Sequence, residues 1–499
     1  MKKKLALLTA IVFVLTLLTG CEGLNIDFSS PQPAQNAPSS DAPSSDAASS
    51  GAKEIALNGS SAVCTAGGVA INGSVVTIAA AGEYTVSGTL DNGQLIVNTG
   101  EDAMDVTVHL HGVSITNQSD AAIYVAQAKN VYLVLDDGTE NTLVSGTEST
   151  ASAFDGTQNG AAIFSEDDLK ISGNGKLDIR GMINNGITGK DDVDIQGGAI
   201  TISAVNNGIK GSESVTVTGG ALAITSGNDG IKSSSALKEG KGYVRIDDGA
   251  VSVSCVGDGI SAETELTVNG GSISVESTGD PANGSCKAVK AKTGLTVNGG
   301  TLCLTSRDHA LHSAAWLTVS GGELELVSHE GKGLAAHGDI LLSGGTLNIS
   351  AFDDGIEGAT VVALSGSAVN IDAGGSGIKV GEKGNGFTAG TGSLSVSGGS
   401  AVIFSAGVPL NSRGTMAVSG GTVLGLGTAK TLREFDSFSQ SYLSCGVSLA
   451  AGTDVSIDDV TSFTAGRSGN CLIFTSPALK AGTEYSVSSV SGSVIAAAK

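Results

Sequence analysis

The stretch Val193-Asp-Ile-Gln-Gly-Gly-Ala-Ile-Thr-Ile-Ser203 contains the pattern that decides the fold. Apolar and polar residues alternate on both sides of a glycine doublet, and this alternation with β-branched residues predicts two short strands. A glycine doublet between them permits a bend that few other residues allow. The same pattern returns in Val215-Thr-Val-Thr-Gly-Gly-Ala-Leu-Ala-Ile-Thr225 and in Leu295-Thr-Val-Asn-Gly-Gly-Thr-Leu-Cys-Leu-Thr305.

This unit recurs with a spacing that is mostly 22 residues and is 29 or 32 in a few places. A third short strand follows a further glycine in each repeat, as in Asn207-Gly-Ile-Lys210 and Asp229-Gly-Ile-Lys232. Three short strands per repeat, with no helical pattern, predict an all-β solenoid, a parallel β-helix. The composition agrees, because 73 glycines and 4% aromatic residues suit a narrow interior of stacked small side chains.

The N-terminus predicts export and a lipid anchor. The basic Lys2-Lys3-Lys4 precedes an apolar stretch, residues 5–18, that is short for a membrane span. Leu18-Thr-Gly-Cys21 then matches the lipobox of bacterial lipoproteins, in which the cysteine is lipidated. We therefore expect a protein lipid-anchored at Cys21 to the extracellular face of the bacterial cell membrane.

Four segments follow from these patterns. Residues 1–20 are the expected signal peptide, and residues 21–50 a Ser/Ala/Pro-rich tether with too little apolar content to pack. Residues 51–430 are the expected β-helix, and residues 431–499 a small C-terminal β module that caps it.

The remaining cysteines show no CxxC spacing, which argues against a zinc site. Cys445 and Cys471 are close enough in sequence to form a disulfide in the C-terminal module, whereas buried free thiols are the alternative inside the coils. The six positions are Cys64, Cys255, Cys286, Cys303, Cys445 and Cys471.

The formal charge of −22 excludes nucleic acid as a partner, because the phosphate backbone selects basic surfaces. An acidic polysaccharide would require clustered lysines or bridging cations on such a protein. The sequence contains candidates for both.

Carboxylates recur at the same position of successive repeats, where they would repel each other unless a cation lay between them. Hard oxygen ligands in this arrangement suit Ca²⁺, of which the number of ions stays open. The alternative is that Asn-Gly and Asp-Gly supply the turn conformation that each corner needs. The candidate calcium ligands are Asp167, Asp168, Asp191, Asp192, Asp229, Asp258, Asp353 and Asp354.

The residue that follows the isoleucine of the third strand should point outward, because side chains alternate along a strand. Lysines in this column are candidates to meet the carboxylates of a uronate chain, and aromatic rings to stack on sugar faces. The alternative is that each lysine pairs with an aspartate of a neighbouring repeat. The candidate carbohydrate-binding residues are Lys210, Lys232, Lys290, Tyr124 and Phe164.

Several stretches resemble one family in order along the chain: residues 82–97, Val108-His-Leu-His-Gly-Val-Ser-Ile115, Leu135-Asp-Asp-Gly-Thr-Glu-Asn-Thr-Leu143, Ser165-Glu-Asp-Asp-Leu-Lys-Ile171 and residues 474–485. From about residue 55 to residue 490, the chain resembles the calcium-binding, carbohydrate-binding β-helix lipoproteins of clostridia and related Firmicutes. The resemblance implies a right-handed parallel β-helix that binds polygalacturonate and cellulose without established catalysis.

Two other classes compete with this hypothesis. A pectin-active lyase would need a basic residue beside bound calcium, and Arg180, Arg245 and Arg307 are the arginines available in the regular repeats. None lies in a recognisable lyase signature, and the later motifs of a polygalacturonase are missing, so we expect no catalytic residues. A surface or adhesion stalk is the third class, in which the repeat supplies length alone. The favoured hypothesis is a surface-anchored, calcium-dependent and non-catalytic protein that binds pectin or cellulose.

Overall fold

The computed structural model describes residues 51–100, 104–146, 160–236, 238–381, 391–431 and 433–499, and every regular element in them is a β-strand. The predicted signal peptide, the predicted lipidation site Cys21 and the predicted tether to residue 50 lie outside the described residues. Within the described part, no helix is long and apolar enough to cross a membrane. The chain divides into two compact units, here called the N-terminal unit (described from residue 51 to 308, with 312–314) and the C-terminal unit (309–311 and 315–499).

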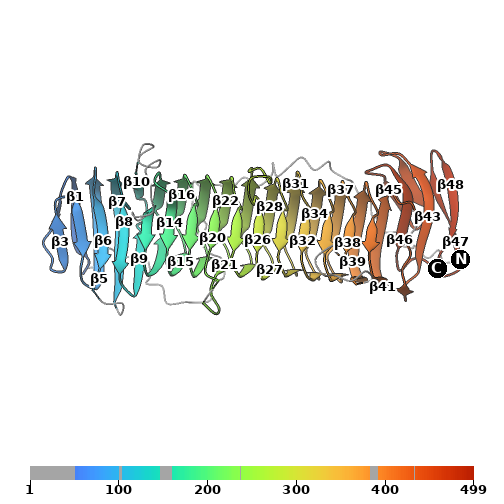
Figure 1. The fold of residues 1–499 in the computed structure, drawn as a ribbon, viewed down its shortest axis with the longest axis horizontal. Helices are drawn as coiled ribbons and strands as arrows, with labels where there is room; N and C mark the ends of the chain where they lie inside the picture. Colours follow the sequence, from blue (N-terminus) through green and yellow to red (C-terminus); the bar gives the residue numbers. More distant parts are fainter. Residues whose placement is uncertain (1–50, 101–103, 147–159, 237, 382–390, 432) are drawn as a thin grey trace, which may run out of the picture. The chain divides into compact units, whose positions relative to one another are not determined.

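The N-terminal unit is built from coils of three strands, and each strand pairs in parallel with its counterpart in the next coil (Figure 1). We call the three series of paired strands the first, second and third ladders. The first contains β7 (Asp105–Asn117), β9 (Asn130–Leu135), β12 (Asp168–Gly173), β15 (Asp192–Ile195), β18 (Ser214–Val217), β21 (Tyr243–Ile246), β24 (Glu265–Val268) and β27 (Gly294–Val297). The second contains β7 again, β10 (Glu140–Ser145), β13 (Lys176–Gly181), β16 (Ala199–Ala204), β19 (Ala221–Ser226), β22 (Ala250–Cys255), β25 (Ser272–Ser277) and β28 (Thr301–Ser306).

The third ladder faces a different side of each coil. It contains β4 (Val75–Ile78), β6 (Gln94–Asn98), β8 (Ile123–Gln127), β11 (Ala161–Ser165), β14 (Asn185–Gly189), β17 (Ile209–Gly211), β20 (Ile231–Ser233), β23 (Ile260–Ala262) and β26 (Val289–Ala291). At the N-terminal end, β1 (Lys53–Gly59) is parallel to β5 (Gly82–Leu90), which pairs with β7. Two short strands there are antiparallel to their partners, β2 (Ala62–Cys64) to β1 and β3 (Val69–Asn72) to β4.

The C-terminal unit repeats the three ladders. Its first contains β30 (Trp316–Val319), β33 (Ile340–Leu342) and β36 (Val361–Leu364), and its second β31 (Glu323–Ser328), β34 (Thr346–Ala351) and β37 (Ala368–Ala373). Both ladders continue into the long strands β39 (Ser393–Ser405) and β41 (Thr415–Gly427). The third contains β32 (Leu334–Ala336), β35 (Ile356–Gly358), β38 (Ile378–Val380) and β40 (Leu410–Ser412). The strand β29 (Leu311–Ser313) is divided between the two units.

The parallel pairing ends at the last long strand. There β46 (Gly469–Thr475) runs antiparallel to β41 and to β43 (Tyr442–Leu449), while the short β42 (Ser437–Phe438) is parallel to β41. A separate antiparallel sheet contains β45 (Thr461–Thr464), β44 (Asp454–Ile457), β47 (Glu484–Ser489) and β48 (Gly492–Ala497). The predicted all-β class with a parallel β-helix and a C-terminal β module is confirmed.

The core of each coil is a stack of identical or similar side chains. Ile187, Ile209, Ile231 and Ile260 are fully buried, and each lies in register with the next. Burying one such side chain contributes roughly 1.5–3 kcal/mol. The register is kept across a 29-residue repeat at Ile231 and Ile260, and across a 32-residue repeat where Ile378 pairs with Leu410. The extra residues therefore lie outside the ladders, and the outward columns predicted from the sequence are not shifted.

At two positions the neighbouring coil lies so close that only glycine fits. Gly220, in a doublet, has a φ of +82°, and a Cβ there would lie 2.8 Å from the carbonyl carbon of Gly197. Gly208, before the third strand, would place a Cβ 2.3 Å from Cγ2 of Ile224 and 2.7 Å from the carbonyl oxygen of Gly230. These glycines let successive coils approach to the spacing of paired strands, about 4.8 Å.

The C-terminal module has its own apolar cluster. Phe404 of β39 and Phe463 of β45 are both buried in it, with ring centroids 6.4 Å apart. Leu426 and Leu472 belong to the same cluster and lie opposite each other on β41 and β46. The last coil is thus covered by apolar side chains of the module instead of ending in an exposed core.

The disulfide considered between Cys445 and Cys471 is not formed, and both thiols are free and buried. Cys445 is paired with Leu472, and Cys471 with Gly446. A difference of one residue in register places two side chains on opposite faces of a sheet, so these sulfur atoms do not meet. Burial, with the nearby Cys471 as a smaller cause, raises the pKa of Cys445 to about 11.

Replacing Gly208 with alanine should destabilise the fold by about 1–3 kcal/mol, because the added methyl group overlaps with the core and with the next coil. The matched control is Gly284→Ala, since a Cβ at Gly284 has no neighbour within 4 Å. The thermal midpoint followed by circular dichroism at strand wavelengths should fall for the first variant and stay near wild type for the second. Equal midpoints would contradict the close approach of the coils.

Candidate functional site

A row of amide and carboxylate side chains connects the coils just before the third ladder. The Asn185 Oδ1 accepts a hydrogen bond from the backbone N–H of Asn207 at 3.0 Å, and the Asn207 Oδ1 accepts one from the N–H of Asp229 at 3.2 Å. The Asp229 Oδ1 continues the row by accepting from the N–H of Asp258 at 2.8 Å. All four side chains are buried. We call this row the corner ladder.

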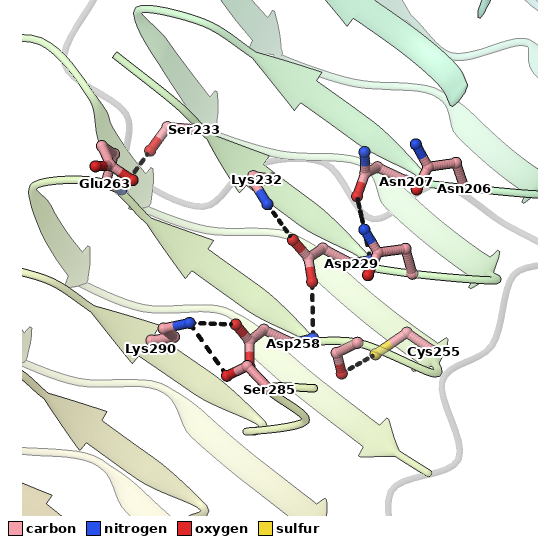
Figure 2. A network of polar contacts seen from close by, with 12 residues as sticks. Asn206, Asn207, Asp229, Lys232, Ser233, Cys255, Asp258, Glu263, Ser285 and Lys290 are labelled. Carbon is pink, nitrogen blue, oxygen red and sulfur yellow. Dashed lines mark hydrogen bonds and ion pairs between the residues drawn. The ribbon is translucent and has the colours of Figure 1, made fainter. Parts of the chain in front are cut away.

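Where the corner ladder contains aspartate, a lysine neutralises it (Figure 2). The Lys232 ammonium lies 2.7 Å from the Asp229 Oδ2, and the Lys290 ammonium lies 2.8 Å from the Asp258 Oδ2. Asp258 also accepts hydrogen bonds at Oδ1 from the Lys287 N–H at 2.9 Å and from the Ser285 hydroxyl at 2.6 Å. Buried carboxylates require such partners, because an unpaired charge away from water is costly.

The same arrangement occurs in the C-terminal unit. The Asp354 Oδ1 accepts from the Ser376 N–H at 2.7 Å, and its Oδ2 lies 2.8 Å from the Lys379 ammonium. Lys379 also contacts Glu357, and Lys332 contacts Glu357 and Asp353, so the group forms a network of ion pairs. Burial alone would lower the pKa of Lys332, but its carboxylate partners raise it above the ordinary lysine value.

These contacts assign a structural role to three of the predicted calcium ligands. In Asp229, Asp258 and Asp354, one carboxylate oxygen accepts a backbone N–H and the other meets a lysine ammonium. An ion at these positions would have to displace both partners. The corner interpretation, which the sequence left open, therefore describes these aspartates better than metal coordination does.

Four of the five other predicted ligands form an acidic patch at the start of the first ladder, whereas the fifth, Asp353, pairs with Lys332 in the C-terminal unit. Asp168 and Asp192 occupy equivalent positions on β12 and β15, and the N–H of Asp192 donates to the Asp168 Oδ1 at 3.3 Å. Burial raises the pKa of Asp168, and the charges of Asp192 and Asp191 add to this effect. Asp167, from the same segment, accepts at Oδ2 from the N–H of Ala128 at 2.8 Å. We call Asp167, Asp168, Asp191 and Asp192 the acidic patch.

One side of the acidic patch is already neutralised. The Lys241 ammonium lies 2.7 Å from the Asp192 Oδ2 and 3.1 Å from the Glu213 Oε2, and the Ser214 hydroxyl donates to the Asp192 Oδ1 at 2.7 Å. The negative charges of Asp168 and Asp191 are therefore less fully compensated than that of Asp192. Within the described ranges, no three His, Cys, Asp or Glu side chains converge closely enough to hold a metal ion by themselves.

The lysines predicted to bind carbohydrate differ from one another. Lys232 and Lys290 form the ion pairs with the corner ladder, whereas among the described residues Lys210 has no carboxylate partner. Burial lowers the pKa of Lys210, and the positive charges of Lys232 and Lys190 lower it further. In the third ladder Lys210 stands between Thr188 and Lys232, so the half-buried ammonium lies in a locally positive region.

The two predicted aromatic residues pack against each other. The rings of Tyr124 and Phe164 meet edge to face with centroids 6.1 Å apart, and Lys190 lies 5.8 Å from the centroid of Phe164. Phe164 is 9% exposed, so its ring is packed against neighbours instead of being presented to solvent. This arrangement does not favour the expected stacking of a sugar on Phe164.

The structure adds residues that the sequence patterns did not single out. Lys190 and Lys241 contact predicted site residues from other coils, and Phe352 and Arg467 line a groove in the C-terminal unit. Phe352 directly follows strand β34, and a valine occupies the equivalent position in some other repeats. An apolar residue that recurs at this outward position was a sequence signal that could have identified it. Lys241 lies in an insertion between β20 and β21 and Arg467 in the C-terminal module, and neither segment carries the repeat pattern.

Comparison with known proteins decides the family. The chain matches the family described as "Carbohydrate-binding domain-containing protein" over residues 72–331 and 322–483. It belongs to this family. A curated relative of the same description from Acetivibrio thermocellus is 39% identical over 140 residues, which is 28% of this chain and 48% of the relative. The match thus spans about half the length of that relative.

A solved structure is also similar to this member of the family. The polysaccharide lyase-like protein from C. thermocellum, in a gadolinium derivative, is 34% identical and has a TM-score of 0.45. The similarity covers 49% of this chain and 96% of that one.

The corner ladder can be tested at Asp258. Asp258→Ala removes the acceptor of a buried N–H and leaves Lys290 unpaired, so we expect a loss of about 1–3 kcal/mol of stability. Asp258→Asn should cost less, because asparagine supplies the same acceptor in the coils of Asn185 and Asn207. Urea midpoints of the two variants measure the difference.

The same variants distinguish the corner role from calcium binding. Calcium should shift the midpoints of wild type and Asp258→Asn by the same amount if Asp258 serves only the corner. Loss of a calcium-dependent shift in the asparagine variant would show instead that Asp258 is a ligand.

Proposed function

We propose that this protein is a non-catalytic binding protein for plant cell-wall polysaccharide, in the first place the acidic polygalacturonate of pectin. Family membership supports carbohydrate as the class of ligand. The observation that favours an acidic chain is the region around Lys210, whose half-buried ammonium lacks a carboxylate partner in the described structure. A uronate carboxylate would supply that partner and relieve the repulsion from Lys190 and Lys232.

We further propose that calcium assists this binding at the acidic patch. Burial and, to a smaller extent, the like charges of Asp192 and Asp191 raise the pKa of Asp168, and a divalent cation nearby would oppose this shift. Asp168 and Asp191 would supply ligand oxygens to the ion, while Asp167 accepts the Ala128 N–H and Asp192 is engaged by Lys241 and Ser214. Calcium takes six to eight oxygen ligands, so a few protein carboxylates leave positions for the carboxylates of the glycan and for water.

The surroundings of the arginines support binding without catalysis. A lyase needs a basic group free to take a proton from the sugar. The Arg180 guanidinium lies 2.7 Å from the Asp178 carboxylate, and the Arg245 Nε lies 3.0 Å from the Asp247 carboxylate. Both arginines thus form ion pairs with an aspartate of their own segment at the protein surface. This pairing favours a structural role over that of a catalytic base.

Binding to polygalacturonate should require calcium and Lys210. Lys210→Met removes the ammonium but keeps an apolar chain of similar length, and we expect roughly tenfold weaker binding, or about 1.4 kcal/mol. Asp168→Asn with Asp191→Asn should abolish the effect of calcium. Affinity electrophoresis of residues 51–499 in gels with polygalacturonate, with calcium or EGTA, measures both.

A matched control is Lys176→Met, because Lys176 lies on the outward side of the second ladder and, among the described residues, forms its ion pair with Glu140 alone. Binding through Lys210 should also decline with rising pH earlier than for an ordinary lysine, since burial lowers the pKa of Lys210. New double bonds or reducing ends in the gel would overturn the non-catalytic assignment. If polygalacturonate changes the mobility of the protein in none of the gels, the protein does not bind it, and the stalk hypothesis is favoured.

We propose finally that Cys21 carries the lipid that anchors the protein to the extracellular face of the bacterial cell membrane. The lipobox Leu18-Thr-Gly-Cys21 supports this. The full chain produced in a bacterial host should partition into the membrane fraction, and Cys21→Ala should move it to the soluble fraction. Equal partitioning of the two forms would refute the anchor.

A further inference from the structure

An open groove of about 600 Å³ lies in the C-terminal unit, remote in sequence from the acidic patch and from Lys210. It is lined by Glu330, Ala351, Phe352, Asp353, Gly374 and Arg467. Its volume lies within the range of small-molecule sites, roughly 300–1,000 Å³. Phe352 is 67% exposed, more than any other aromatic residue among the exposed apolar side chains of the described chain.

The fold leaves this ring uncovered for a specific reason. Phe352 follows the last residue of β34, at the outward corner of its coil, and Gly374 occupies the same position one coil further on. A Cβ at Gly374 would lie 2.0 Å from the carbonyl oxygen of Phe352, so no side chain fits there. The Phe352 ring therefore has no side chain beside it at the equivalent position of the next coil.

Polar groups surround the ring. Arg467 reaches the groove from the segment between β45 and β46, and its Nε is paired with the Asp372 carboxylate of β37. On the other side the Asp353 Oδ2 lies 2.9 Å from the Lys332 ammonium. Both charged side chains that frame the groove are thus held in place by partners in the same unit.

The combination fits a sugar. The face of a pyranose ring carries C–H groups that pack on an aromatic ring, and its hydroxyls donate to carboxylates and accept from a guanidinium. The three carboxylates of Glu330, Asp353 and Asp372 outnumber the two cations beside them, Arg467 and Lys332, so the surroundings disfavour a negatively charged uronate. The charge distribution selects a neutral ring.

We propose that this groove, here called the Phe352 groove, binds a neutral pyranose residue of a cell-wall glycan and is distinct from the region that binds the acidic chain. The proposal rests on the proposed function in that the protein must bind glycan at all. It adds a second surface with the opposite preference for charge. One chain would then contact acidic and neutral glycans through different coils.

Val256 provides a matched control. It occupies the same position of its coil as Phe352, two residues before a corner aspartate, and is 51% exposed. It does not line the Phe352 groove. Val256→Phe therefore places an aromatic ring at an equivalent corner without the groove, and Val256→Ala tests the loss of an exposed apolar side chain.

The test is titration of residues 51–499 with cellohexaose, xylohexaose and mannohexaose by calorimetry, beside affinity electrophoresis on polygalacturonate. We expect wild type to bind at least one neutral hexasaccharide, and Phe352→Ala to weaken that binding at least tenfold. Phe352→Trp should retain it, and the two Val256 variants should bind like wild type. Phe352→Ala should leave binding to polygalacturonate unchanged.

The other possible outcomes refute either the Phe352 groove alone or both proposals. If wild type binds polygalacturonate but none of the neutral hexasaccharides, the Phe352 groove is refuted and the proposed function stands. If neutral binding survives Phe352→Ala, or Phe352→Ala and Val256→Ala weaken it equally, the groove is likewise refuted. Circular dichroism confirms that the variants are folded. If wild type binds no glycan of either kind, both proposals fail together.

Discussion

The structure depends on the close and regular stacking of one coil on the next. Parallel strands, buried isoleucines and the corner ladder all require that equivalent residues of adjacent coils meet in register. Backbone hydrogen bonds alone would permit a slip by one residue, which would turn every apolar side chain outward. The corner ladder opposes such a slip, because a side-chain oxygen of Asn207 or Asp229 accepts the N–H of one particular residue in the next coil. The glycines belong to the same constraint, since a Cβ at Gly208 would hold the coils apart.

This constraint determines which charged residues are available for function. Asparagine fills the corner without charge, but aspartate there brings a buried carboxylate that needs a cation. Lys232, Lys290 and Lys379 supply it from the third ladder. Lys210 is released from this task, because asparagine occupies the corner both of its own coil (Asn207) and of the preceding coil (Asn185). The alternation of Asn and Asp along one row of the sequence thus decides which lysine of the outward column is free to meet a ligand.

Much of the fold followed from the sequence, because each coil buries the same positions. The alternation around Gly197-Gly198 and the step Asn207-Gly-Ile fixed the strands and the columns, and the longer repeats did not shift them. Predictions of the site were less complete. The sequence identified the columns of Asp and Lys but left open whether they meet each other or a ligand. It grouped Asp229 and Asp258 with Asp168 as calcium ligands, and all three accept a backbone N–H. Asp229 and Asp258 also pair with a lysine ammonium, whereas Asp168 lies near the carboxylates of Asp191 and Asp192.

The sequence by itself determined the β-helical repeat, the positions that point outward and the acidic balance of the chain, because these depend on spacing and composition. Only the tertiary structure decided which charges are paired, since Lys241 reaches Asp192 across 49 positions and Arg467 reaches Asp372 across 95. It likewise decided that Phe164 is packed against Tyr124 while Phe352 is exposed, and that Cys445 and Cys471 face opposite sides of their sheet. Contacts of this kind depend on how insertions and the C-terminal module pack onto the coils, and no repeat pattern encodes them.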